Sequence, residues 1–134
     1  MTSSRDDPKP VTRLATCACA QLSARCAGEP LLVSLCHCLE CQKRTGSAFG
    51  LAAFFPRGAV ETSGEARQFS RRSDSGKSVT FHFCPHCGST VFWEAERKPD
   101  AIAVAVGTFA DPTFPAPAQT VYADHRHPWA MASF

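Results

Sequence analysis

The sequence of 134 residues predicts a single, mostly β domain with little helix. No long stretch repeats apolar residues with the period of a helix, whereas several short runs alternate apolar and polar side chains or are apolar throughout. Eight cysteines are present, and seven of them lie one or two residues from another cysteine. We therefore expect short strands at close spacing, with cysteine clusters clamping their ends.

The first half of the chain contains a tail followed by three short elements. We expect residues 1–15 to be a flexible N-terminal tail, since Pro8 and Pro10 disfavour an early helix, and residues 16–134 to be the folded domain. A strand, one helical turn and a second strand are expected at residues 31–35, 40–45 and 51–55.

The second half is expected to contain five strands, at residues 60–62, 66–70, 78–83, 90–93 and 102–106. The first two flank Gly64, which predicts a hairpin. In the third, Val79, Phe81 and Phe83 alternate with polar residues, so we expect His82 on a solvated face. The third and fourth flank a cysteine pair and are expected to form a hairpin around it.

Charge and hydropathy exclude several classes of partner. The formal net charge is +2 with basic residues scattered, and the densest cluster (Arg71, Arg72 and Lys77) fits a solvated hairpin face, so we expect no nucleic-acid binding. No apolar run approaches the roughly 20 residues of a membrane helix, so we expect no membrane partner. The polar N-terminus lacks the apolar stretch of a secretory signal, which predicts a cytoplasmic protein with reduced thiols.

The cysteines form two pairs, Cys17 with Cys19 and Cys84 with Cys87. A trio consists of Cys36, Cys38 and Cys41, and Cys26 is isolated. Neighbours at such spacing converge on a metal more readily than they form an unstrained set of disulfides. We therefore predict metal binding. Cys26 has no partner in this pattern, and we expect a free, buried and inert thiol there.

The run Cys84-Pro85-His86-Cys87-Gly88 is typical of a metal-binding knuckle, in which a tight turn aims two sulfurs at one point. Two thiolates do not complete a tetrahedral zinc site. The pair Cys17 and Cys19 is the economical donor of the other two ligands, which predicts a closed, structural four-thiolate site. We expect His86, at the tip of the turn, to be exposed rather than a ligand.

The trio Cys36, Cys38 and Cys41 has two interpretations. It can be a second structural site with His37 or a distant histidine as the fourth ligand, or an open site with three protein ligands, which is typical of catalytic zinc. We favour the open site, because His37 lies between two ligands and its side chain should project away from the metal. We expect two zinc ions per chain and allow for partial occupancy of the second site; iron is a chemical alternative for thiolate ligands.

Together these residues resemble the glutathione-dependent formaldehyde-activating enzyme (Gfa) family, which includes centromere protein V. Further matching stretches are Gly28-Glu29-Pro30, Gln42-x-x-Thr45-Gly46-Ser47-x-Phe49, Ser73-Asp74-Ser75-Gly76, Gly88-Ser89, Gly107-Thr108 and Pro128-Trp129. The resemblance implies a β-tent fold of small antiparallel sheets held by zinc. It also implies structural zinc at the two pairs and catalytic zinc at the trio. One departure is Ala20, where many relatives have glycine.

The resemblance implies a zinc-dependent carbon–sulfur lyase that condenses glutathione, or a related thiol, with formaldehyde or a small aldehyde to give S-hydroxymethylglutathione or its analogue. Zinc with three thiolates suits a fourth, soft thiolate better than hydroxide. Candidate donors to the developing alkoxide are Ser47, Thr45 and the amides of Gly46-Ser47. Lys43 and Arg44 are either cations close to the site or exposed charges on a short helical turn. Glu40 is expected either to accept a hydrogen bond, for instance from His37, or to face water.

Two other functions stay open at this point. One is a thiol-binding zinc carrier without catalysis, because thiols and aldehydes combine without help. The other is a structural zinc module of the kind that centromere protein V suggests. We rank the structural module last, because an open three-cysteine site has no purpose in a purely structural protein.

Overall fold

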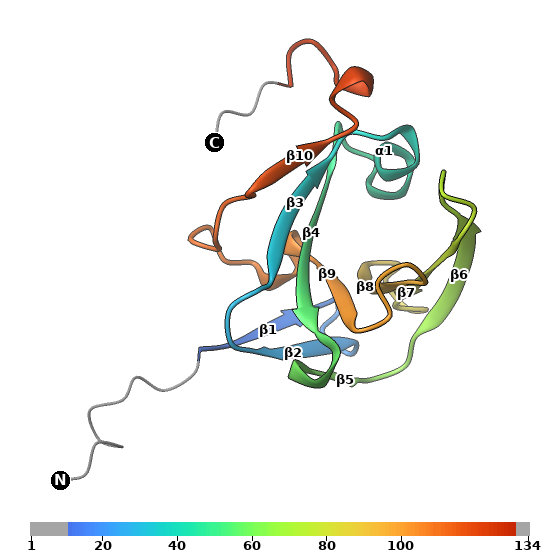
Figure 1. The fold of residues 1–134 in the computed structure, drawn as a ribbon. Coiled ribbons are helices and arrows are strands. Elements are labelled where there is room, and N and C mark those ends of the chain that lie inside the picture. Colours follow the sequence, from blue (N-terminus) through green and yellow to red (C-terminus); the bar gives the residue numbers. More distant parts are fainter. Residues whose placement is uncertain (1–10, 131–134) are drawn as a thin grey trace, which may run out of the picture.

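The computed structural model describes residues 11–130, which form two β-sheets and one α-helix (Figure 1). The strands are β1 Thr12–Thr16, β2 Ser23–Ala27, β3 Leu32–Cys36, β4 Gly50–Pro56, β5 Val60–Ser63, β6 Arg67–Arg72, β7 Ser78–Phe83, β8 Thr90–Ala95, β9 Ala101–Ala105 and β10 Gln119–Val121. The helices are α1 Leu39–Thr45 and the short 3₁₀ turns η2 Arg57–Ala59, η3 Val106–Phe109 and η4 Ala123–His125. The predicted mostly β fold with little helix is confirmed.

The small sheet has the strand order β1-β2-β5, and the large sheet has the order β10-β3-β4-β9-β8-β7-β6. All pairs are antiparallel except β10 and β3, which run parallel, so the large sheet is mixed rather than purely antiparallel. In Figure 1 the large sheet curves from β3 and β4 round to β6, with α1 in the upper part of the view and the small sheet in the lower part.

The main core lies where the small sheet packs against the large one. Its buried residues include Ala15, Leu22, Ala24, Cys26, Phe55, Val91, Phe92, Ile102, Val104 and Phe109. The other face of the large sheet carries a second, smaller cluster of Phe81, Trp93 and Ala103, with Ala52 and Ala105 packed against it. Because strand side chains alternate, this sheet has apolar residues on both faces.

Strands β3 to β9 match the sequence-based expectations, whereas β1, β2 and β10 were not expected. The predicted hairpin around Gly64 is wrong. β5 pairs with β2 in the small sheet, whereas β6 pairs with β7 in the large sheet. Gly64 is where the chain crosses from one sheet to the other. It has a positive φ of 100°, and a Cβ placed there would lie 1.9 Å from the carbonyl oxygen of Gln21. The glycine therefore serves a close backbone approach between sheets rather than a hairpin turn.

The N-terminal boundary also differs from the expectation. Strand β1 begins at Thr12 and pairs with β2 from Thr12↔Ala27 to Thr16↔Ser23, so residues 12–15 are strand rather than tail. Residues 1–10 of the expected tail lie outside the described residues. Only Ala15 of this strand is buried. The sequence of the strand therefore lacks the alternation of apolar and polar residues by which a strand is predicted.

His82 was expected on a solvated face, and this prediction is wrong. The residue is 8% exposed, its ring stacks on Phe92 with centroids 4.4 Å apart, and its Nε2 lies 2.9 Å from Glu94 Oε1. His82 does lie on the strand face opposite Phe81, but that face packs into the main core.

Among residues 11–130, no helix has the length and apolar character needed to cross a membrane.

Candidate metal centres

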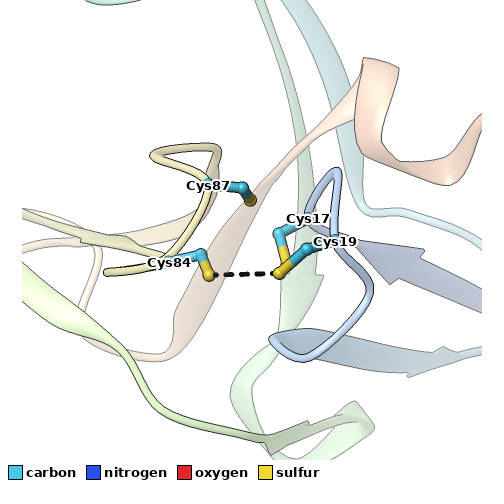
Figure 2. Close-up of side chains that lie close together, drawn as sticks. All are labelled: Cys17, Cys19, Cys84 and Cys87. Atoms are coloured by element: carbon cyan, nitrogen blue, oxygen red, sulfur yellow. Dashed lines mark hydrogen bonds between the residues drawn. The ribbon is translucent and has the colours of Figure 1, made fainter.

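Four cysteines from two distant turns form one cluster. Cys17 and Cys19 lie between β1 and β2, and Cys84 and Cys87 lie between β7 and β8, with all four side chains turned toward one point (Figure 2). Their sulfurs lie within 4.8 Å of one another, and the Cys17–Cys19 and Cys19–Cys84 separations are 3.6 and 3.7 Å. Zinc–sulfur bonds of about 2.3 Å in a tetrahedron place sulfurs about 3.8 Å apart. The cluster therefore fits a single zinc ion.

Backbone N–H groups donate to the sulfurs of this cluster. The amides of Leu22 and His86 donate to Cys17 Sγ and Cys84 Sγ, each at 3.3 Å. In the first turn Ala20 adopts a positive φ of 70°, which explains why a glycine is also suitable at this position. Desolvation raises the pKa of the Cys84 thiol, but hydrogen bonds from the Gln21 side chain and from the Cys87 and His86 amides outweigh it, so this pKa lies below its ordinary value.

The four-cysteine cluster lies where the turn of the small sheet meets a hairpin of the large sheet. Cys17 and Cys84 are buried, whereas Cys19 and Cys87 are exposed. The hydroxyl of Ser89, 3.4 Å from the Cys87 sulfur, is the largest cause that lowers the pKa of Cys87 to about 5. The cluster joins the turn of the small sheet to a hairpin of the large sheet, so a bound metal would hold the two sheets together. His86 is exposed, as expected, and lies 3.1 Å from Glu65.

The second cluster consists of Cys36, at the end of β3, Cys38, at the N-cap of α1, and Cys41, in the first turn of α1. The three sulfurs lie within 4.8 Å of one another. The Cys41 amide donates to Cys38 Sγ at 3.3 Å, and the Cys38 amide donates to Cys36 Sγ at 3.5 Å. The strand end and the helix start thus present three sulfurs to one point.

Within residues 11–130 this second cluster has three ligands and no fourth. The His37 side chain is 1% exposed and packs edge-on against Phe49, with ring centroids 5.8 Å apart. Burial is the main cause that lowers the pKa of His37, so the ring is neutral in this environment. The expectation that His37 projects away from a shared metal agrees with this position.

A guanidinium lies beside the second cluster. The hydrogen bond with Cys36, with further help from Cys38 and Arg44, lowers the pKa of Cys41 to about 5 despite burial. The same hydrogen bond with Cys41 is the largest cause that raises the pKa of Cys36. Without metal, the trio therefore concentrates one negative charge on Cys41, next to the Arg44 guanidinium. Of the two expected cations, Arg44 is the one at the cluster, whereas the side chain of Lys43 is 78% exposed.

The three-cysteine cluster opens onto a cavity of about 500 Å³ between α1 and the second face of the large sheet. Its floor is formed by Gly50, Ala52, Phe54, Phe81, Trp93 and Ala95, and its walls include Arg44, Arg71, Asp74 and Tyr122. The small residues on β4 and β8 leave the space that larger side chains would fill. None of the cysteines of the four-cysteine cluster lines this cavity.

Other predicted residues lie away from the cavity or are engaged elsewhere. Ser47 is exposed and does not line the cavity; its amide donates to Thr45 Oγ1 at 3.1 Å. The Gly46 amide donates to the carbonyl of Gln42. The role of Ser47 as a donor to the alkoxide stays a prediction. Glu40 lies 3.8 Å from Lys43 instead of accepting a hydrogen bond from His37.

Cys26 is fully buried in the main core, apart from both clusters. Burial raises its pKa to about 11, as expected for an inert thiol. The cavity residues that sequence reasoning missed, such as Trp93 and Tyr122, come from β8 and from the segment after β10. Only the pairing of the large sheet brings these segments to the trio, so no local motif could have revealed them.

The fold and the two clusters define a small, mostly β protein with a closed four-cysteine and an open three-cysteine candidate metal site. The profile of the family described as glutathione-dependent formaldehyde-activating enzyme matches residues 12–125. The chain belongs to this family, and the match spans both cysteine clusters.

A comparison with solved structures finds the same fold in a Rhodobacter sphaeroides protein determined as a structural genomics target. The two chains are 17% identical with a TM-score of 0.56, and the match covers 80% of this chain and 98% of the other. At this identity the likeness concerns the fold alone. A comparison with curated proteins gave no match.

Proposed function

We propose that this protein is a zinc-dependent carbon–sulfur lyase that condenses glutathione, or a related thiol, with formaldehyde or another small aldehyde. The observation that carries the proposal is the position of Cys36, Cys38 and Cys41 on the wall of a cavity large enough for a small-molecule substrate. Membership of a family described by this activity supports it. The four-cysteine cluster, which lies off the cavity, has the structural role.

The donor sets suit zinc at both clusters. Four thiolates at tetrahedral spacing suit a closed site, and three thiolates beside a cavity suit a site with a position free for substrate. Zinc held by the trio would supply a soft coordination position and lower the pKa of an incoming thiol. Thiolates also suit iron, so metal analysis of the purified protein is the first measurement.

The chain's own residues would bind and orient the substrates. The apolar floor with Phe54, Phe81 and Trp93 excludes water, and the alanines leave room for the thiol's carbon chain. In the reaction, the thiol sulfur forms a bond to the carbonyl carbon, the carbonyl π pair moves to oxygen, and the thiol proton ends on that oxygen. Holding thiol and aldehyde side by side in the cavity is the protein's main contribution to the rate.

The proposed reaction can be tested by exchange NMR on an equilibrium mixture of glutathione, formaldehyde and S-hydroxymethylglutathione. The zinc-loaded protein is expected to accelerate exchange between free and condensed glutathione. Cys38→Ser should abolish the acceleration, whereas Cys26→Ser, in which a thiol away from both clusters is removed, should keep it. Glutathione binding without acceleration would indicate a thiol carrier instead. If the protein neither binds glutathione nor accelerates the exchange, it is a structural module.

A further inference from the structure

Two arginines converge on one aromatic ring at the wall of the cavity. The guanidinium carbon of Arg44 lies 5.3 Å from the centroid of the Phe81 ring, and that of Arg71 lies 5.5 Å from it. Arg44 is also stacked over Trp93 at 4.3 Å. Arg44 comes from α1 and Arg71 from β6 (Figure 1), and both residues line the cavity. Like charges held so close to one ring repel each other, and an anion that lies near both guanidinium groups would reduce this repulsion.

Within residues 11–130, no carboxylate pairs with these two arginines. Among the described residues, two carboxylates line the cavity: Glu40 pairs with Lys43 at 3.8 Å, and Asp74 is the main cause that raises the pKa of the Tyr122 hydroxyl. The buried Nε of Arg44 also lacks a hydrogen-bond partner. A buried N–H donor without a partner is costly, and an incoming anion would satisfy it.

Arg44 lies beside the three-cysteine cluster, and Arg71 shares the Phe81 ring with it. A Cβ placed on Gly50 would be 3.0 Å from Arg44 Nη2 and 3.3 Å from Cys41 Cβ, so one small residue contacts both the guanidinium and the cluster. An anionic group a few bonds from a sulfur at the trio would therefore reach the arginines. The planar guanidinium presents paired N–H groups that match a carboxylate.

We propose that Arg44 and Arg71, on the ring faces of Phe81 and Trp93, form an anion subsite that selects thiols carrying a carboxylate close to the sulfur. This inference rests on the proposed function, because it assumes that a thiol sulfur occupies the open position of the trio. It assigns Arg71 as a specificity-determining residue. Arg44 has a second contact, with Cys41, and is therefore less suitable for a test of substrate choice.

The test compares two small thiols that differ in charge, mercaptoacetate and 2-mercaptoethanol. Each is titrated into the full-length protein loaded with cobalt at both sites, and binding is followed by thiolate-to-cobalt charge transfer. The titration contains no aldehyde, so it reports the carboxylate of the thiol alone. The variant is Arg71→Gln. The matched control is Arg72→Gln, the next residue of β6, which is exposed, donates to the Gly76 carbonyl and does not line the cavity.

Arg71→Gln is expected to weaken mercaptoacetate binding about tenfold and to leave 2-mercaptoethanol binding unchanged. Arg72→Gln should behave as the unchanged protein with both thiols. The ratio of the dissociation constants of the two thiols is compared across the variants, so the difference in acidity between the two thiols cancels. If mercaptoacetate binds to the Arg71→Gln variant as well as to the unchanged protein, the proposal of an anion subsite is wrong, whereas the proposal of an open thiol site is still supported. If neither thiol changes the spectrum of the unchanged protein, the proposed function fails and the subsite with it.

Discussion

Gln21 Nε2 donates a hydrogen bond to the sulfur of Cys84 at 3.0 Å. The same nitrogen donates to the carbonyl oxygen of Glu65 at 2.7 Å, and Gln21 Oε1 accepts from the Glu65 amide at 2.9 Å. One side chain therefore joins the first cysteine turn, the second cysteine turn and the segment that crosses between the sheets. This segment and the four-cysteine cluster form a single structural unit.

Gly64, in that crossing segment, is expected to be sensitive to substitution. In Gly64→Ala the new methyl carbon would lie 1.9 Å from the Gln21 carbonyl oxygen, at a φ of 100°. We expect chemical denaturation to show a loss of at least about 2 kcal/mol in the free energy of unfolding. Gly76→Ala is the matched control, because φ is 83° and nothing lies within 4 Å of the new carbon. It should cost about 1 kcal/mol. Equal losses in the free energy of unfolding would show that the close approach of Gly64 to Gln21 does not make this position more sensitive to substitution.

The two cysteine clusters are expected to respond differently to ligand removal. Cys87→Ala removes a ligand from the cluster that joins the two sheets, so we expect a large fall in melting temperature. Cys38→Ala removes a ligand from the cavity wall, so we expect the fold to persist with about one equivalent of metal lost. Thermal unfolding, combined with metal analysis by mass spectrometry, checks both. If the two variants melt alike, the assignment of a structural and a functional site is wrong.

Much of the metal-site geometry could be predicted from the sequence because it depends on local turns. Cys84-x-x-Cys87-Gly88 specifies its turn within five residues, and Gly88 has the positive φ, 81°, that this turn requires. The amide of Gly88 donates to the Cys84 carbonyl at 2.9 Å. The β7–β8 hairpin could be predicted for the same reason, since its strands alternate and flank this turn.

Pairing between distant strands could not be predicted. The short, polar strands β5 and β6 flank a single glycine, a pattern that fits a hairpin as well as a crossing between sheets. Alternation along β7 showed that His82 and Phe81 lie on opposite faces, but it could not show that both faces are covered. The position of Arg44 depends on Trp93, which β8 brings to the cavity from far along the sequence.

Glu94 is expected to make stability depend on pH. Its carboxylate lies 2.7 Å from Arg57 Nη1 and 2.9 Å from His82 Nε2, and the hydrogen bond with Arg57 is the main cause that holds the pKa of Glu94 below 4.5. A lowered pKa in the folded state contributes stability that is present above about pH 4.5 and is lost as pH falls through the folded-state pKa. We therefore expect Glu94→Gln to be less stable than the unchanged protein at neutral pH.

This stability difference should shrink as pH falls below 4.5, which denaturation at a series of pH values would measure. Both proteins keep the same cysteine clusters, so the loss of metal in acid cancels in the comparison. Glu61→Gln is the control, because Glu61 is exposed and makes no ion pair within the described part of the chain. A difference for Glu94→Gln that stays constant with pH would contradict the interpretation.

Adjacent residues of α1 provide a test of the charge beside the trio. Lys43 is 78% exposed and lies near Glu40, whereas Arg44 is stacked over Trp93 and lies beside Cys41. Three thiolates around Zn²⁺ have a net charge of about −1 by ligand counting, which a guanidinium at the cluster offsets. We expect Arg44→Gln to weaken metal retention at the three-cysteine site about tenfold, as is typical for the loss of a partner of a metal ligand.

Chelator competition would measure this effect, because release from the two clusters should occur in two phases. In Arg44→Gln the early phase, from the three-cysteine site, should shift to lower chelator concentration while the late phase stays in place. Lys43→Gln should leave both phases unchanged, since an exposed charge contributes little. A shift of both phases in Arg44→Gln would indicate general destabilisation. Unchanged phases would show that the buried guanidinium does not stabilise the cluster, leaving the anion of a substrate as its main partner.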